Sequence, residues 1–192
     1  MRVTKLASPR GVVRDRVLQA ALELFAEHGV SGTSLQMIAD RVGVAKASVY
    51  YQFHTKEDIV LTLISPVFED IARLVKIADA VGSQEARRDV AISGLVELAV
   101  RNRRLTTVFF GDPVIDPLVR SHDEFAAAIE GFDTLLNGPN PDDATRVSMS
   151  VITAGIYGTA ISPHLVDVSD DDMHRLLLAT TQRLLVALAP TE

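Results

Sequence analysis

The stretch TSLQMIADRVGVAKASVYYQFHTKE, residues 33–57, decides how the N-terminal part of this chain folds. Its apolar side chains recur three and four positions apart on both sides of Gly43, which predicts two short amphipathic helices that meet at this glycine. A tight turn between helices needs a residue that tolerates positive φ, and glycine does so without a steric penalty. The small side chain of Ala39 allows the two helices to cross closely. The stretch therefore predicts a pair of steeply crossed helices.

Two sets of side chains complete this pattern. Apolar residues that can fill the junction between the helices are Ile38, Val42, Val44 and Val49. Small or polar residues that face away from it are Lys46, Ala47, Ser48, Tyr51 and Gln52. A second helix with such an outer face can enter the major groove of DNA, which favours a helix-turn-helix unit. Taken alone, a glycine between two short helices also fits an ordinary helical hairpin.

The flanking sequence predicts one further helix on each side. The preceding helix is indicated by the half-buried helical spacing of Val13, Val17, Ala21, Leu24 and Phe25. Gly29 and Gly32 end it. After the stretch, Thr55 can cap a long helix that runs toward residue 81. This helix contains Pro66, and because proline lacks a backbone N–H and clashes with the preceding turn, we expect a kink or a break there.

Breaks rich in glycine, asparagine and proline divide the remainder into helical segments at residues 84–101, 105–110, 117–136, 141–162 and 170–188. No segment alternates with the period of a β-strand over more than a few residues. We therefore expect an all-α protein of about nine helices. The expected domains are residues 1–56, which hold an N-terminal arm and the three-helix helix-turn-helix domain, and residues 57–192.

The composition excludes several classes of protein. The chain of 192 residues has no cysteine, which excludes disulfides, thiolate metal sites and thiol redox switches. Its longest unbroken apolar run, residues 184–189, is far too short to cross a bilayer. Its first 30 residues lack the apolar core of a signal peptide. We expect a cytoplasmic protein with no membrane partner.

The charge is unevenly distributed along the chain. The formal net charge is −6, yet the first 60 residues hold eight Lys and Arg against six Asp and Glu, and the remaining 132 hold eleven against nineteen. Such asymmetry is a hint of a nucleic-acid partner, although charged runs are more often simply solvated surface. Arg2, Lys5 and Arg10 could reach a minor groove. A tail that makes no DNA contact fits the sequence at least as well.

Residues 33–57 closely resemble the N-terminal signature of the tetracycline-repressor (TetR) family of transcriptional regulators. The spacing Ala21-x-x-x-Phe25-x-x-x-Gly29 also matches the first helix of that family, so the resemblance covers about residues 14–60. The chain departs from the family pattern at Ala45, where Ser or Thr is usual, at Ala47, where Gly is common, and at Gln52, where His is common. The resemblance implies a ligand-responsive regulator, in particular a repressor that a small-molecule effector releases from a palindromic operator in double-stranded DNA.

The resemblance also implies contacts between the second of the two crossed helices and DNA. Lys46 and Ser48 would face bases, since lysine can donate to guanine O6 and N7. Tyr50 and Tyr51 would contact phosphates or thymine methyl groups. The alternatives are that Tyr50 packs in the small core and that Lys46 is merely solvated.

Further contacts are implied around the first of the two crossed helices. Thr33 and Ser34 would hold a phosphate, because backbone donors and the dipole at a helix N-terminus favour an anion. Gln36 would reach the edge of the groove. Lys56, at the start of the following long helix, would clamp another phosphate.

The family's larger domain implies a homodimer held by the last two helices, here residues 141–162 and 170–188. The last helix carries a stripe formed by Met173, Leu176, Leu177, Thr180, Leu184 and Leu188. Within this stripe, Leu177 and Leu184 are the predicted interface residues. Gly155 and Gly158 cost helix stability, roughly 1 kcal/mol each relative to alanine. Close approach of a partner helix would explain them, and an intramolecular neighbour would explain them equally.

The same resemblance implies a small-molecule pocket among the middle helices, mostly apolar with few polar anchors. The candidate lining residues are Phe68, Ile71, Phe109, Phe110, His122, Phe125 and Tyr157. Of these, His122 and Tyr157 can supply hydrogen bonds. Packing in the protein core is the more common explanation for each residue of this set.

The sequence carries no zinc-protease motif, phosphate-binding glycine loop, dinucleotide fingerprint or nucleophile elbow. The run His122-Asp123-Glu124 with Asp116 could hold a metal, but adjacent residues on a helix do not share a face, which favours a solvated polar patch. We therefore expect no enzyme, no metal and no cofactor. The alternatives to a regulator are a helical ligand-binding protein whose DNA function is lost and a small-molecule enzyme built on the C-terminal domain.

Overall fold

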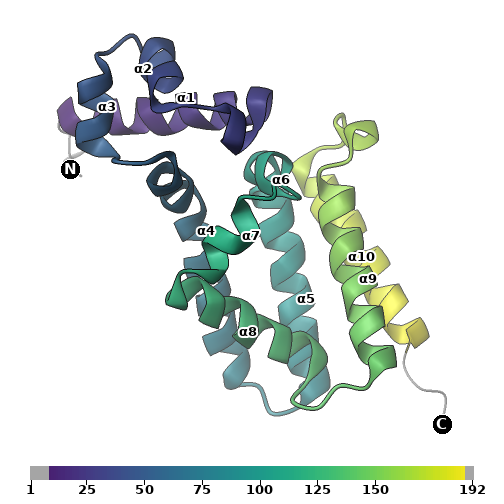
Figure 1. The fold of residues 1–192 in the computed structure, drawn as a ribbon. Helices are drawn as coiled ribbons and strands as arrows, with labels where there is room; N and C mark the ends of the chain where they lie inside the picture. The colour runs from purple at the N-terminus through teal and green to yellow at the C-terminus, as the bar shows by residue number, and fades with distance from the viewer. Residues whose placement is uncertain (1–8, 189–192) are drawn as a thin grey trace, which may run out of the picture. The chain divides into compact units, whose positions relative to one another are not determined.

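The computed structural model describes residues 9–188, and these residues form only helices and their connections (Figure 1). The helices are α1 (Pro9–Gly32), α2 (Leu35–Val42), α3 (Lys46–Gln52), α4 (Lys56–Asp79), α5 (Gln84–Arg101), α6 (Arg103–Phe109), α7 (Ile115–Arg120), α8 (Asp123–Asn137), α9 (Asp143–Ala160), the 3₁₀ turn η1 (Pro163–Leu165) and α10 (Asp170–Leu188). No β-strand occurs in this part of the chain, so the all-α prediction is confirmed.

The helices group into two compact units. The N-terminal unit contains the chain up to Ser65 together with Val108–Leu118, and the C-terminal unit contains Pro66–Thr107 and the chain from Val119 onward. The sequence predicts a boundary at residue 56, directly after the helix-turn-helix. In the structure the chain changes unit three times, and each change falls inside a helix, namely α4, α6 and α7.

A small apolar core holds the N-terminal unit together. Val17 and Ala21 of α1 are fully buried, as are Ile38 of α2 and Val49 of α3, which confirms the helical spacing that predicted these elements. The ring of Phe25 lies 6.0 Å from the ring of Phe109, at the end of α6. Burial of an aromatic side chain is among the largest apolar contributions to stability, so the segment from residue 108 is part of this core.

The last turn of α1 is bent at Gly29, whose φ of 72° and ψ of 167° are not helical. This conformation leaves the backbone N–H of Val30 without its partner in the helix. The carboxylate of Asp112 accepts a hydrogen bond from that N–H at 3.2 Å, and also one from the N–H of Val114 at 2.9 Å. Asp112 therefore closes the end of α1 and the start of α7 at once.

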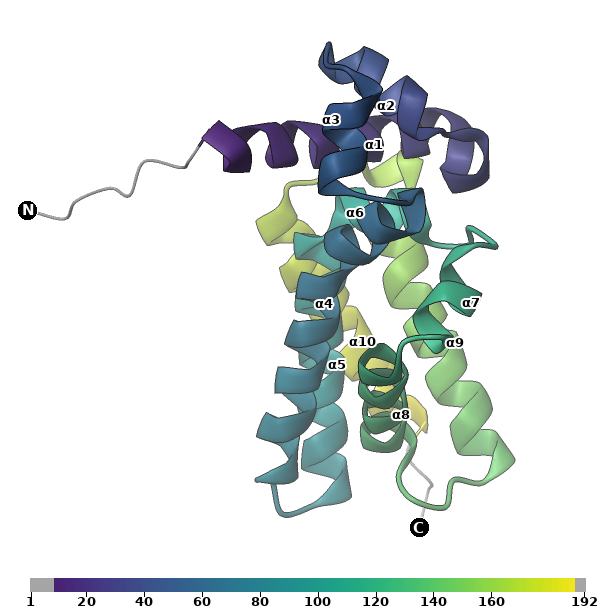
Figure 2. The same ribbon diagram turned by 60° about the vertical axis from the view of Figure 1, so that its left-hand side comes forward.

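The core of the C-terminal unit lies where α5, α8, α9 and α10 meet. Its fully buried side chains include Ile92, Leu95, Val96 and Ile156. Two glycines lie close to side chains of α4: a Cβ at Gly94 would overlap the end of the Leu74 side chain, and one at Gly131 would lie 3.1 Å from the side chain of Val75. Both glycines let a neighbouring helix pack closely against α4, which Figure 2 shows beside α5.

Two helix predictions are wrong in detail. The sequence predicts one helix over residues 117–136, but the structure has α7 and α8, separated at Ser121 and His122. His122 has extended backbone angles, and Asp123 and Glu124 form an acidic first turn that stabilises a helix N-terminus. Of the kink or break predicted at Pro66, the break is absent, because α4 continues through this residue, while the kink stays a prediction. The two compact units divide between Ser65 and Pro66.

Candidate DNA-binding surface

The turn between α2 and α3 has the geometry that the sequence predicts. Gly43 has φ of 75° and ψ of 39°, in the left-handed region. Its N–H donates to the carbonyl of Ala39 at 2.9 Å, and the N–H of Val44 donates to the same carbonyl at 3.0 Å. Ala39 is fully buried, which lets the helices cross closely. The turn is therefore a left-handed glycine cap that ends α2 and starts α3 in a new direction.

Helix α3 buries Val49 and presents its other side chains to solvent. Lys46 and Ser48 are exposed, and Tyr51 is 74% exposed. The ring of Tyr50 is also exposed, and it meets the ring of His54 edge-on at 5.1 Å. The alternative that Tyr50 packs in the core is therefore wrong. Four polar or aromatic side chains on a short rigid helix form a surface that can contact bases and phosphates.

The start of α2 divides the roles of Thr33 and Ser34. The Ser34 hydroxyl oxygen accepts a hydrogen bond from the N–H of Met37 at 3.2 Å and caps α2 at the surface. The Thr33 hydroxyl is buried, and its single proton lies within hydrogen-bond distance of two carbonyls, those of Gly29 at 2.9 Å and of Leu24 at 3.2 Å. The Thr33 hydroxyl is therefore used inside the N-terminal unit. The phosphate contact expected at this helix start, through backbone donors and the helix dipole, stays a prediction.

Gln36 lies on the exposed side of α2, where the sequence predicts it. Its side-chain amide donates to the carboxylate of Asp40, one turn further on, at 2.7 Å. This local pair on an exposed helix face is easily exchanged for another partner.

The ammonium group of Lys56 does not extend from the surface as a phosphate clamp. It donates to the carbonyls of Val30 at 2.9 Å, of Ser31 at 3.2 Å and of Thr33 at 3.4 Å. A lysine ammonium has three donors, and all three are used. The predicted phosphate role of Lys56 is therefore corrected: the side chain caps the C-terminal carbonyls of α1.

The start of α4 confirms the predicted cap at Thr55. The Thr55 hydroxyl oxygen accepts from the N–H of Asp58 at 3.0 Å. In return, the Asp58 carboxylate accepts from the N–H groups of His54 and Thr55 at 3.0 and 2.9 Å. This reciprocal pair is a capping box, and it fixes the position from which Lys56 reaches α1.

Sequence periodicity gives no sign of two further polar contacts in this unit. The Arg41 guanidinium binds Glu27 through two hydrogen bonds, of 3.0 and 2.7 Å, and thereby joins α2 to α1. The hydrogen bond from Arg41 lowers the pKa of Glu27, and the same bond raises the pKa of Arg41. Arg16 donates to the carbonyl of Val42 at 2.7 Å and caps the end of α2.

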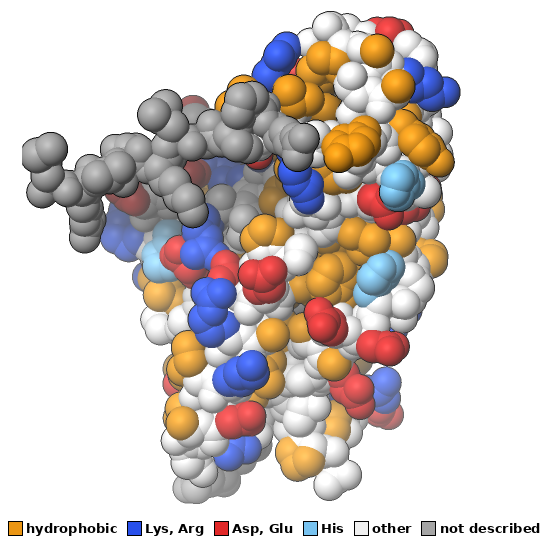
Figure 3. Space-filling model, turned by 90° about the vertical axis from the view of Figure 1, so that its left-hand side faces the viewer, with side chains coloured by type: hydrophobic (Ala, Val, Ile, Leu, Met, Phe, Trp, Pro, Cys, Tyr) orange, Lys and Arg blue, Asp and Glu red, His pale blue; other side chains and the backbone are white. Residues whose placement is uncertain are grey.

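Most basic side chains described in the N-terminal unit are engaged in contacts within the protein. The guanidinium of Arg14 lies 4.6 Å from the centre of the Phe53 ring. Among the basic side chains described between residues 11 and 60, Lys46 alone has no intramolecular partner. On the face drawn in Figure 3, Lys and Arg side chains lie among Asp and Glu rather than apart from them. The predicted arm contacts fall on Arg2, Lys5 and the side chain of Arg10, which lie outside the described residues.

A second candidate surface follows α9. Val147 and Val151 are exposed on it, and Val151 is 65% exposed. A Cβ added at Gly155 or Gly158 would meet nothing within 4 Å, so no helix among the described residues of the C-terminal unit packs there. The alternative that an intramolecular neighbour explains these glycines is therefore wrong. Leu184, on the neighbouring α10, is half exposed.

The predicted interface residue Leu177 does not belong to this surface. It is 7% exposed and packs with Met149 and Met173 in the core of the C-terminal unit. Helix α10 buries one stripe in that core and exposes Leu176 and Leu184 beside it. Periodicity alone cannot separate the two stripes, because both are apolar and they lie one residue apart in the sequence.

The predicted pocket residues fall into separate places. Phe68 and Phe125 stack at 4.5 Å between ring centres, and the His122 ring stacks on Phe125 at 5.7 Å. Ile71 lies in the same small cluster as Phe68. The structure brings these four residues together, from α4 and the start of α8, within the C-terminal unit.

The remaining three candidates lie elsewhere. Phe109 is buried against Phe25 in the N-terminal unit, and Phe110 is exposed. Tyr157 packs against the larger core of the C-terminal unit, where burial raises the pKa of its hydroxyl. The prediction that all seven residues form one group is therefore wrong.

No group of three or more His, Cys, Asp or Glu within the described part of the chain is arranged to hold a metal ion. The helices between residues 9 and 188 include none with the length and apolarity needed to span a bilayer.

Comparison with known proteins identifies the N-terminal pattern. Residues 17–63 match the family model for bacterial regulatory proteins of the tetR family. Over 81 residues, 41% of this chain and 42% of the relative, the chain is 37% identical to the uncharacterized HTH-type transcriptional regulator YezE of Bacillus subtilis (strain 168). Over 77 residues, 40% of this chain and 39% of the relative, it is 31% identical to the HTH-type transcriptional repressor AcnR of Corynebacterium diphtheriae. The match therefore spans about two fifths of these curated relatives.

Solved structures resemble the chain over most of its length. The ketosteroid transcriptional regulator KstR2 of Mycobacterium tuberculosis superposes with a TM-score of 0.68 at 18% identity, covering 97% of this chain and 98% of that one. The transcriptional regulator FadR of Bacillus subtilis, solved in complex with stearoyl-CoA, superposes with a TM-score of 0.59 at 22% identity, covering 91% and 96%. At these identities the likeness establishes the fold.

Proposed function

We propose that this chain, whose residues 17–63 match the family model for bacterial regulatory proteins of the tetR family, is a ligand-responsive transcriptional repressor. It binds a palindromic operator in double-stranded DNA as a homodimer in the cytoplasm, and a small-molecule effector releases it. The observation that carries this proposal is the exposed face of α3, held by the Gly43 turn, with Lys46 as its one uncommitted cation in the described part of the N-terminal unit.

The reading of bases is assigned to Lys46, with Ser48 beside it. A lysine without an intramolecular partner can donate to guanine without first breaking a contact in the protein. Tyr51, the most exposed side chain of α3, and Tyr50 beside it contact the backbone or a thymine methyl group. Ser34 and Gln36, on the exposed start of α2, contact the edge of the groove.

The experiment begins with an operator selected by the wild-type protein from a random pool of double-stranded DNA. Lys46→Ala should relax the preference at particular base pairs and cost about 1–3 kcal/mol on the operator. Lys76→Ala is the matched control, because it removes an equal charge from an exposed position on α4. If the two variants weaken binding alike at every position of the operator, Lys46 does not read bases.

Dimerisation is assigned to α9 and α10. Val147, Val151 and the two open glycines form a row on α9, and exposed leucines of α10 extend it. Glycines on such a row let a second helix approach closely, which offsets their cost to the helix. A two-fold dimer places two copies of α3 about 34–36 Å apart, one turn of DNA.

The effector is assigned to the C-terminal unit, near the stacked rings of Phe68, Phe125 and His122. Two structural neighbours are complexes with ligands that have a large apolar part, stearoyl-CoA on FadR and triclosan on SmeT. An apolar effector with one polar group would match the apolar side chains of Phe68, Phe125 and nearby Ile71 together with the one imidazole of His122. Phe125→Ala should weaken effector-induced release while leaving operator affinity without effector unchanged. If the effector releases this variant as readily as it releases wild type, the effector binds elsewhere.

A further inference from the structure

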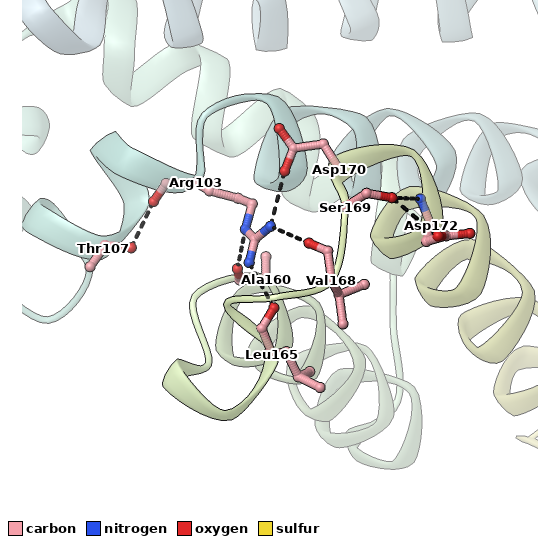
Figure 4. A network of polar contacts seen from close by, with 8 residues as sticks. All are labelled: Arg103, Thr107, Ala160, Leu165, Val168, Ser169, Asp170 and Asp172. Atoms are coloured by element: carbon pink, nitrogen blue, oxygen red, sulfur yellow. Dashed lines mark hydrogen bonds and ion pairs between the residues drawn. The ribbon is translucent and has the colours of Figure 1, made fainter.

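The side chain of Arg103, the first residue of α6, is the centre of a polar network in the C-terminal unit (Figure 4). Its Nε donates to the carbonyl of Ala160 at 2.8 Å, and its Nη2 donates to that of Leu165 at 3.2 Å. Its Nη1 donates to the carbonyl of Val168 at 3.2 Å and to the carboxylate of Asp170 at 2.9 Å. The side chain is only 20% exposed. One guanidinium thus holds four acceptors in fixed directions.

These four acceptors are distributed along the connection between α9 and α10, from the end of α9 to the start of α10. Ala160 is the last residue of α9, Leu165 ends η1, and Asp170 is the first residue of α10. Carbonyls at helix ends lack partners within the helix, so a cation that binds them fixes where the helix stops. The start of α10 is fixed further by Ser169, whose hydroxyl oxygen accepts from the N–H of Asp172 at 3.2 Å.

The other end of α6 is fixed in the N-terminal unit. Helix α6 has only seven residues, and the chain passes from the C-terminal unit to the N-terminal unit between Thr107 and Val108. Phe109, the last residue of α6, packs on Phe25. Three residues later, Asp112 accepts the N–H of Val30 at the bend of α1. Each end of this short helix therefore has its own set of contacts.

We propose that Arg103 is a positioning residue that couples the dimer surface on α9 and α10 to the DNA-binding unit through α6. The inference rests on the proposed function and adds a route that does not pass through the effector site. A palindrome is read only if the two copies of α3 keep one spacing. Arg103 holds the α9–α10 connection against the start of α6, and α6 continues into the unit that carries α3.

The test compares Arg103→Gln with Arg73→Gln on the operator selected by the wild-type protein. Arg73 is an exposed arginine of α4 whose partner, Asp70, lies one turn away, so both variants lose one positive charge from the C-terminal unit. Binding is measured on the selected operator, on the same operator with two base pairs inserted between its halves, and on random DNA. Circular dichroism and sedimentation show whether each variant is folded and dimeric.

Arg103→Gln should remain folded and dimeric, bind the selected operator about tenfold more weakly than Arg73→Gln, and discriminate less between the two spacings. Both variants should bind random DNA equally. Equal operator affinity and equal spacing preference in the two variants would overturn the proposal. If wild type selects no operator, the proposed function fails instead.

Arg103→Lys is the second variant, needed if the glutamine variant does not fold or dimerise. An ammonium group keeps the charge beside Asp170 but cannot replace the planar fork that reaches three carbonyls, so the same loss of spacing preference is expected. A folded, dimeric lysine variant that behaves like Arg73→Gln would contradict the inference. Failure of both variants to fold or dimerise would show that Arg103 is structural only.

Discussion

The ammonium group of Lys56 lies 2.9 Å from the carbonyl oxygen of Val30, so the first residue of α4 holds the end of α1. Two more carbonyls of the same turn complete its hydrogen bonds. The position belongs to the stretch that identifies the family, yet its contacts in this chain are internal. Its contribution is therefore to the stability of the N-terminal unit.

Lys56→Met should lower the free energy of unfolding of the N-terminal unit by about 1–3 kcal/mol, because three carbonyls lose a charged donor. The salt dependence of operator binding should stay that of wild type. Urea unfolding and binding at several salt concentrations measure the two effects. An unchanged stability together with a salt slope reduced by roughly 0.9 would restore a phosphate contact to Lys56.

Two alanine substitutions at glycines should have opposite effects. Gly43→Ala should cost about 1–2 kcal/mol, because a Cβ is strained at a φ of 75° although nothing lies within 4 Å of it. Gly11→Ala, within α1, also meets open space, and it should stabilise by roughly 0.5–1 kcal/mol through helix propensity. Chemical denaturation of the two variants checks the signs, and equal shifts would be inconsistent with a strained turn.

Ala45→Ser should stabilise α3. Ala45 is the residue before the first turn of α3, with extended backbone angles and no side-chain hydrogen bond to the helix. A serine hydroxyl there can accept a hydrogen bond from the backbone N–H of Ala47 or Ser48, and it should stabilise the folded state by about 0.5–1 kcal/mol. Thermal unfolding measures the gain. Ala47→Ser, on the exposed face of the same helix, is the control and should bring none.

Val151→Glu should give a folded monomer. Val151 is exposed in the single chain, so a carboxylate there costs nothing until a partner helix covers it. Sedimentation should show dissociation, whereas Ile77→Glu, at an exposed apolar position on α4, should remain dimeric. Leu177→Glu should instead unfold the C-terminal unit, because Leu177 is part of its core. A dimeric Val151→Glu would move the interface away from α9.

The cap of α9 should make stability depend on acid pH. Hydrogen bonds from the side chain and the backbone N–H of Thr145 lower the pKa of Asp142 below its ordinary value of 3.8. The charged form therefore stabilises the folded state above that value, and the contribution is lost as the pH falls through the lower folded pKa. At pH 5 the melting temperature of wild type should be higher than that of Asp142→Asn. Below the lowered pKa of Asp142 the two melting temperatures should be equal.

The control for this effect is Asp143→Asn, which removes an equal charge from the next position. The melting temperature of this variant should differ from that of wild type only through loss of the exposed ion pair with Arg146, because the cap at Asp142 is intact. A difference between wild type and Asp142→Asn that stays constant from pH 5 to the acid end would contradict the assignment.

The local half of this structure follows from the sequence. Gly43, Ala39 and Val49 lie where spacing predicts them, because helix period, small residues and positive φ act over a few residues. The cap at Thr55 follows for the same reason. The family resemblance likewise rests on this short stretch.

Contacts between distant residues could not be predicted in the same way. Lys56 and Val30 are 26 positions apart, and Arg103 and Asp170 are 67 apart, so no periodicity connects them. Leu177 and Leu176 carry the same side chain, and only the packing of α10 decides which one is buried. The acidic pair Asp123 and Glu124 indicates the start of α8 after His122. The same two residues also fit a metal site or a solvated patch, so the sequence alone does not show that a helix begins there.

The contact between Phe25 and Phe109 also limits how this protein can be divided. A gene fragment that encodes residues 1–65 alone lacks the segment 108–118, and with it the ring that covers Phe25 and the carboxylate that closes α1. The N-terminal unit, which carries α3, is thus encoded by two separate stretches of the gene. A chimaera that joins this unit to the ligand-binding part of another protein has to include residues 108–118, so recombination at a single crossover point cannot exchange the unit intact.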